Sequence, residues 1–207
     1  DFRGQIIHPQ QWPEDMEYTG RKIVVIGSGA TAVTLLPALE GLGAQVTMLQ
    51  RTPSYIGPLP EKDTISAVWK RLLPGPLAYK VARFNHGARD MSQFVIAQRA
   101  PWLFKTALRA MQRRYISVEM IDQHFTPDYR PWDQRVCKAP DGDIFRSLTR
   151  GASVVTGHIE TFTPTGIRLT SGQEIEADVI VTATGLRLQA FGGGTLSIDG
   201  QPLDIPS

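Results

Sequence analysis

The sequence has a single cysteine, no long apolar run and almost no excess of either charge. Cys137 stands alone among 207 residues, which excludes an internal disulfide and a metal site built from several cysteines. One cysteine suits a reducing compartment, so we expect a cytoplasmic protein. No apolar stretch approaches the roughly 20 residues that a membrane-spanning helix needs. A formal net charge of +2 is too small to indicate nucleic-acid binding.

The sequence also lacks any clustered set of catalytic or metal-binding residues. His8, His86, His124 and His158 are scattered along the chain without metal-ligand spacing, so we expect each to be an ordinary surface or core histidine and expect no metal. The first residue is Asp1, inside a patterned segment, and no signal peptide is visible. We therefore expect the chain to be part of a longer polypeptide.

A glycine-rich turn follows an apolar run near the start of the chain. Residues 23–26 are all β-branched without polar alternation, which is typical of a strand buried on both faces. Residues 27–32 read GSGATA, the G-x-G-x-x-A form of the dinucleotide fingerprint. A helix at 30–42 and a second strand at 45–50 complete the βαβ unit that the fingerprint requires.

Each small residue of this turn has a separate physical task. Gly27 permits the tight turn, Gly29 lets the backbone approach a pyrophosphate, and Ala32 lets the helix pack close to the strand. The anion would then lie on the unpaired N–H groups at the helix start. The alternative is a tight turn without a ligand. The predicted cofactor-binding residues of the turn are Gly27, Ser28, Gly29, Ala30, Thr31 and Ala32.

The end of the second predicted strand indicates which nucleotide is bound. Sites for NAD usually carry an acidic residue there, which accepts hydrogen bonds from the ribose hydroxyls. This sequence has Arg51 and Thr52 instead, and a guanidinium pairs well with a 2′-phosphate. We therefore predict NADP(H). The alternative for Arg51 is a solvated loop cation.

The whole pattern predicts an α/β protein, with a Rossmann-like domain built on a parallel sheet. Residues 178–181 read DVIV, and their apolar run predicts another strand. It is followed by Thr184 and Gly185, which we add to the predicted cofactor-binding residues. A hairpin is expected within 166–181, and a C-terminal hairpin around Asp199.

Residues 62–125 do not follow the strand–helix alternation and instead predict an all-helical insertion. Between Lys62 and Arg114 there are eleven Lys or Arg residues but only the acids Asp63 and Asp90. One interpretation is weak association with an anionic membrane surface. The other is a set of solvated helix faces whose aliphatic stems cover apolar surface.

A short motif precedes the first strand. Phe2, Gly4, His8, Trp12 and Pro13 form F-x-G-x-x-x-H-x-x-x-W-P, which by itself reads as a linker with aromatic anchors. Directly ahead of a G-x-G-x-x-[GA] strand, this motif resembles the signature of type I Baeyer–Villiger monooxygenases, relatives of the flavin-containing monooxygenases. The likeness extends over essentially the whole chain. PWDQRVC and ATGLRLQAFGG most resemble the branch that activates thioamide prodrugs such as ethionamide.

The resemblance implies an NADPH domain that faces an FAD domain with a fingerprint of its own. In that family NADPH reduces the flavin, which with O2 oxidises ketones or sulfur and nitrogen compounds. The expected partners are thus a ketone or thioether-like substrate, O2 and an FAD domain absent here. The resemblance implies an interdomain linker at 1–19, an NADP domain at 20–185 with its insertion at about 62–125, and a return linker at 186–207.

One catalytic residue is also implied by the resemblance. The family places an arginine of the NADPH domain over the flavin to stabilise developing negative charge, and the matching position here is Arg135. Many members have a lysine before this arginine, whereas this chain has Gln134. The alternative for Arg135 is a structural salt bridge with Asp133 or Asp141.

Two other functions fit parts of the pattern. A stand-alone NADP(H)-binding module or sensor would need only the glycine turn and Arg51. A pyridine-nucleotide disulfide reductase shares the fold plan, but it needs a redox pair of cysteines, and only Cys137 is present.

Overall fold

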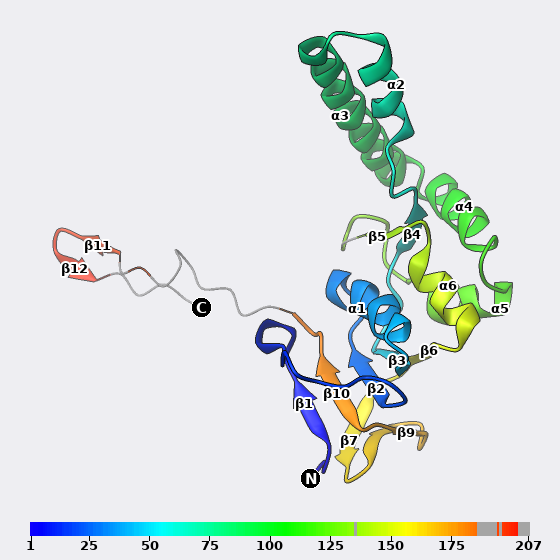
Figure 1. Ribbon diagram of the computed structural model, residues 1–207, viewed down its shortest axis with the longest axis vertical. Coiled ribbons are helices and arrows are strands. Elements are labelled where there is room, and N and C mark those ends of the chain that lie inside the picture. The colour runs from blue at the N-terminus through cyan, green and yellow to red at the C-terminus, as the bar shows by residue number, and fades with distance from the viewer. Residues whose placement is uncertain (135, 186–193, 195, 203–207) are drawn as a thin grey trace.

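The computed structural model describes residues 1–134, 136–185, 194 and 196–202 (Figure 1). A five-stranded sheet forms its centre, in the order β1-β10-β2-β3-β6, and every neighbouring pair is parallel. The sheet consists of β1 (Gln5–Ile7), β2 (Lys22–Ile26), β3 (Gln45–Gln50), β6 (Ser153–Thr156) and β10 (Val179–Thr182). The predicted α/β fold with a parallel sheet is confirmed.

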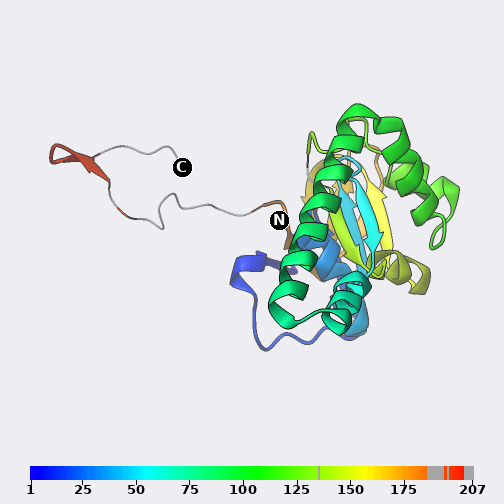
Figure 2. The ribbon, with the colours of Figure 1, turned by 90° about the horizontal axis from the view of Figure 1, so that it is seen from above.

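The remaining elements pack around this sheet or reach away from it (Figures 1 and 2). The helices are α1 (Ala30–Gly41), α2 (Thr64–Leu72), α3 (Gly75–Arg99), α4 (Pro101–Gln112), α5 (Val118–His124) and α6 (Asp143–Arg150). A parallel pair is formed by β4 (Ile56–Leu59) and β5 (Cys137–Pro140). The antiparallel strands are β7 (Ile159–Thr163), β8 (Gly166–Leu169), β9 (Glu174–Glu176), and the hairpin β11 (Ser197–Ile198) and β12 (Gln201–Pro202).

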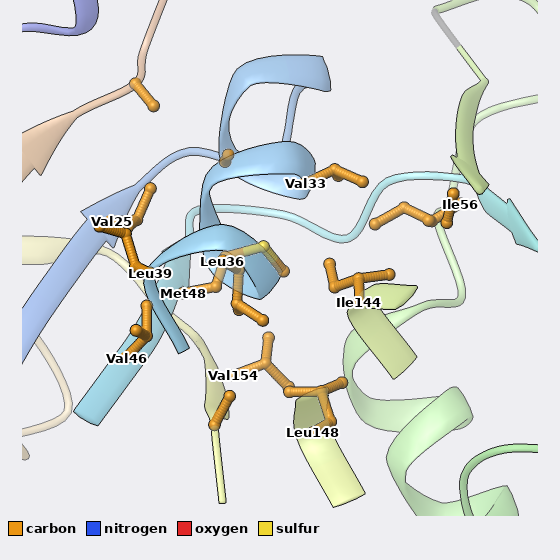
Figure 3. Packing of buried hydrophobic residues seen from close by; sticks show 14 of the residues in the cluster. Val25, Val33, Leu36, Leu39, Val46, Met48, Ile56, Ile144, Leu148 and Val154 are labelled. Carbon is orange, nitrogen blue, oxygen red and sulfur yellow. The ribbon is translucent and has the colours of Figure 1, made fainter. Parts of the chain in front are cut away.

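Both faces of the sheet are buried, as the apolar run of β2 predicts. Successive side chains of a strand point to opposite faces. Val25 therefore packs on the side of α1 with Leu36, as Figure 3 shows. Val24 belongs to a second cluster on the other side, with Ile167 of β8. One core thus lies between the sheet and the helices α1 and α6, and the other lies between the sheet and β7–β9.

The N-terminal segment that the sequence predicts to be a linker contributes a strand. In β1, Gln5 pairs with Val179 and Ile7 with Val181 of β10. This pairing satisfies backbone groups that would otherwise stay open along the edge of β10. Ile7 is 4% exposed and Ile6 is 56% exposed. Three residues carry too little pattern to predict a strand, so only the tertiary pairing shows it.

The predicted helical insertion is present, between β4 and β5. The prolines at 74 and 76 separate α2 from α3, as expected, although α3 already begins at Gly75 with Pro76 in its first turn. Ser117 caps α5, because its hydroxyl accepts a hydrogen bond from the Met120 N–H at 3.3 Å. In Figure 1, α2 and α3 extend away from the sheet. Among the residues that the structure describes, no helix is long and apolar enough to cross a membrane.

A buried polar network joins α5 to the ends of β3 and β6. The Gln50 amide donates to the His124 carbonyl at 2.7 Å and to the Thr156 hydroxyl at 2.9 Å. The Thr156 hydroxyl lies 2.7 Å from Nδ1 of His124. Since this hydroxyl already accepts from Gln50, its own proton can point to Nδ1, which requires a neutral imidazole there. Burial lowers the pKa of His124 below its ordinary value of 6.5.

We therefore expect stability to fall as the solution is acidified. A histidine whose pKa is lowered by folding contributes its full stability above the pKa of the unfolded chain, near 6.5. That contribution is lost as the pH falls through and below this value. The measurement is urea unfolding at pH 7.5 and at pH 5.5. His124→Gln should flatten the difference between the two, and an unchanged difference would show that His124 is not its source.

Candidate functional site

The carboxyl ends of the parallel strands open into a cleft of about 960 Å³. Ligands of open α/β sheets bind at this edge, and the volume suits a dinucleotide. Every predicted cofactor-binding residue except the buried Ala32 lines the cleft. These residues are Gly27, Ser28, Gly29, Ala30, Thr31, Arg51, Thr52, Thr184 and Gly185.

The two glycines of the turn have different surroundings. Gly27 has φ +132°, and a Cβ there would lie 2.4 Å from the Ala183 carbonyl oxygen. Gly27 is therefore required by the packing of β2 against the end of β10. Gly29 has an extended backbone, and a Cβ there would meet no protein atom within 4 Å. Gly29 thus faces open space in the cleft.

The start of α1 can hold an anion. Its N-cap is Gly29, no side chain caps it, and no acidic residue lies in its first turn. The first N–H groups of a helix have no partner inside the helix, and they carry the positive end of its dipole. Ala32 is fully buried in the first turn, where α1 packs against the sheet. Backbone N–H groups at this place fit a diphosphate.

A hydroxyl group that sequence reasoning missed, that of Ser54, lies beside the turn. The Ser28 and Ser54 hydroxyl oxygens are 2.7 Å apart. Burial raises the pKa of Tyr129, although a hydrogen bond with Ser54 opposes this. The Cys137 thiol donates to the Ser28 carbonyl at 3.8 Å. Ser54, Tyr129 and Cys137 all line the cleft. Their positions depend on how the loops fold together, so no local sequence signal could have found them.

The predicted catalytic residue Arg135 lies outside the described residues. Its neighbours are described: Gln134 lines this cleft, whereas Val136 lines a second, apolar cavity of about 350 Å³. This cavity lies between α3, α4, β4 and β5, and Trp132 and Leu108 also line it. Cys137 borders both spaces.

The histidine of the N-terminal motif joins the segment before β2 to the segment after β10. His8 Nε2 lies 3.2 Å from the Gly185 carbonyl oxygen, and the Gln10 N–H donates to His8 Nδ1 at 3.2 Å. Because Nδ1 accepts, Nε2 carries the proton and donates to Gly185. His8 therefore holds the segment before β2 beside the segment after β10, at the edge of the cleft.

Other fixed positions of the motif are packing positions. A Cβ on Gly4 would lie 2.3 Å from the Asp178 carbonyl oxygen, so only glycine fits there without a shift. Phe2 packs against the second core. The Trp12 indole donates to the Tyr18 hydroxyl at 2.7 Å. The segment is thus anchored to the domain along much of its length.

A serine, a histidine and an aspartate meet at the contact of α2 and α3, but they do not form a catalytic triad. His86 Nε2 lies 2.5 Å from the Asp63 carboxylate and 3.2 Å from the Ser66 hydroxyl. Nδ1 lies 2.9 Å from a guanidinium nitrogen of Arg89, which can only donate. Nδ1 is therefore the acceptor, and Nε2 cannot serve as the base for Ser66.

Comparisons with known proteins point to one group of enzymes. The chain is 51% identical to the FAD-containing monooxygenase EthA of Mycolicibacterium smegmatis, over 99% of the chain and 42% of that protein. It is 48% identical to the probable FAD-binding monooxygenase AlmA of Acinetobacter baylyi, over 98% of the chain and 41% of that protein. The chain thus spans about two fifths of the length of these relatives. No family model matches.

Solved structures share the fold. A steroid monooxygenase bound to NADP aligns with a TM-score of 0.62 at 20% identity, covering 89% of this chain and 42% of that one. A cyclohexanone monooxygenase bound to ε-caprolactone aligns with a TM-score of 0.65 at 21% identity, covering 90% of this chain and 44% of that one. By sequence the chain matches a segment of FAD-containing monooxygenases, and by fold it matches part of these two solved monooxygenases.

Proposed function

We propose that this chain is the NADPH-binding part of an FAD-dependent monooxygenase. Such an enzyme transfers one oxygen atom of O2 to a ketone or to a sulfur or nitrogen compound. The observation that carries the proposal is the shared cleft: the glycine turn, the uncapped start of α1 and Arg51 all open into one space. The greater length of the relatives favours an enzyme part over a stand-alone NADP(H) sensor.

The residues present fit NADPH. The N–H groups at the start of α1 would hold the diphosphate, with Gly29 leaving room for it. Arg51 and Thr52 would hold the 2′-phosphate, and Thr184 and Gly185 would lie along the opposite wall. When bound, NADPH supplies the hydride that reduces the flavin. We assign FAD to the remaining length of such a polypeptide, and Arg135 to the stabilisation of negative charge beside it.

The substrate side of the proposal rests on the apolar cavity. Its walls include Leu103, Phe104 and Leu108 of α4, which suit the hydrocarbon part of a ketone or thioether-like compound. We also propose the domain boundaries that the sequence predicts. Residues 1–19 and 186–207 would be the two connections to an FAD domain. His8 and Gly185 support it, because they bring these two connections together.

The two glycines of the turn give a matched test of the nucleotide site. Gly27→Ala should destabilise the fold by several kcal/mol, because its Cβ would meet the Ala183 carbonyl and φ is positive. Gly29→Ala should leave the melting temperature almost unchanged and weaken NADPH binding at least tenfold. Thermal unfolding and titration calorimetry measure both. A Gly29 variant that binds normally would contradict the placement of the diphosphate.

Arg51 should decide between the two nicotinamide nucleotides. Arg51→Ala removes a charge-assisted contact to the 2′-phosphate and should lower NADPH affinity about tenfold, while NADH affinity stays the same. Calorimetric titration of both nucleotides is the measurement, and Arg71→Ala, an exposed arginine of α2, is the control. Equal losses for NADPH and NADH would mean that Arg51 does not meet the 2′-phosphate.

We further propose a cytoplasmic protein that associates weakly with anionic membrane surfaces through α2 and α3. Leu77, Phe84 and Met91 lie seven residues apart on one face of α3 and are 48%, 74% and 63% exposed. Lys80 and Arg83 lie among them in the sequence and are also exposed. Exposed apolar residues beside cations are the features that bind helices to a membrane interface.

Vesicle co-sedimentation tests this association. The chain should bind vesicles with phosphatidylglycerol more strongly than vesicles of phosphatidylcholine alone, and 1 M salt should weaken the difference. Replacing both Phe84 and Met91 with Ser should reduce binding severalfold, whereas Phe162→Ser on β7 should not. Binding to neither kind of vesicle would contradict the association.

A further inference from the structure

The end of β6 lies directly beside the end of β3 at the cleft. Gln50 of β3 pairs with Thr156 of β6, and the Gly157 N–H donates to the Gln50 carbonyl at 2.9 Å. Neighbouring strands are about 4.8 Å apart. Arg51 follows Gln50, and His158 follows Gly157, so the two chains leave the sheet together at the same edge.

His158 has the position and the freedom to contact a ligand. It lines the cleft together with Arg51 and Thr52, and all three residues are exposed. Its backbone is held, because the Thr170 N–H donates to the His158 carbonyl at 2.9 Å. Within the described part of the chain, the side chains of His158 and Arg51 make no hydrogen bond or ion pair. The backbone of His158 is thus fixed, while its imidazole remains available to a ligand in the cleft.

We propose that His158 is a second specificity residue for the phosphorylated ribose, beside Arg51. This rests on the nucleotide site proposed above and goes beyond it by assigning a role to the end of β6. A ribose 2′-phosphate carries close to two negative charges and three acceptor oxygens, more than one guanidinium satisfies. An imidazole N–H from His158 would contact an oxygen that Arg51 leaves open, and the hydroxyl of Thr52 would reach a third.

The test is a charge series at His158 on the full chain, with NADPH and NADH titrated separately by calorimetry. His158→Glu should weaken NADPH binding about tenfold and leave NADH binding within about twofold, because only NADPH carries the phosphate. His158→Gln should cost NADPH about threefold, and His158→Lys should retain the affinity for NADPH. Thr106→Glu, an exposed position on α4 that does not line the cleft, makes the same change in net charge as His158→Glu and is the control.

The possible outcomes separate this inference from the proposed function. If Arg51→Ala selectively weakens NADPH while the His158 series changes neither nucleotide, the role of His158 is overturned and the nucleotide site stands. Equal losses of NADPH and NADH in His158→Glu would also overturn it. If the unmodified chain binds neither nucleotide, both proposals fail. The melting temperature of each variant shows whether the fold is retained. We expect it to be retained, because His158 is exposed.

Discussion

The contact between the Gly27 backbone and the Ala183 carbonyl determines how the functional edge of the domain is built. No side chain fits between them, so the turn after β2 lies directly against the end of β10. This contact fixes where α1 begins and therefore where its unpaired N–H groups lie. It also brings Thr184 and Gly185, which follow β10, into the same cleft as the glycine turn. A single steric constraint thus joins two segments separated by about 150 residues in the sequence.

Much of the fold could be predicted because its signals are local. The strand, turn, helix and strand of residues 22–50 are contiguous, and both the apolar run and the glycine spacing have direct physical causes. The helical insertion could also be predicted from local signals, because its prolines lie in the first turns of α3 and α4 and mark where these helices begin. The strand β1 was missed because its evidence lies in its partner: three residues gain their structure from the open edge of β10.

The candidate site, like the fold, was predictable only where its signals are local. Its glycine turn and Arg51 belong to one stretch of sequence, so their proximity followed from the βαβ unit. Tyr129 and His158 come from two other segments, and they reach the cleft through strand order and loop packing. A sequence without aligned relatives does not show that β6 neighbours β3. The buried contact of Gln50 with His124 and Thr156, which fastens these strands to α5, has no local signature either.

The hydrogen bond between His8 and Gly185 couples the segment before β2 to the segment after β10. These residues are 177 positions apart, yet their side chain and backbone touch. Since β1 also pairs in parallel with β10, the segment before β2 is attached to β10 both through the sheet and through His8. A displacement of one segment would therefore carry the other with it.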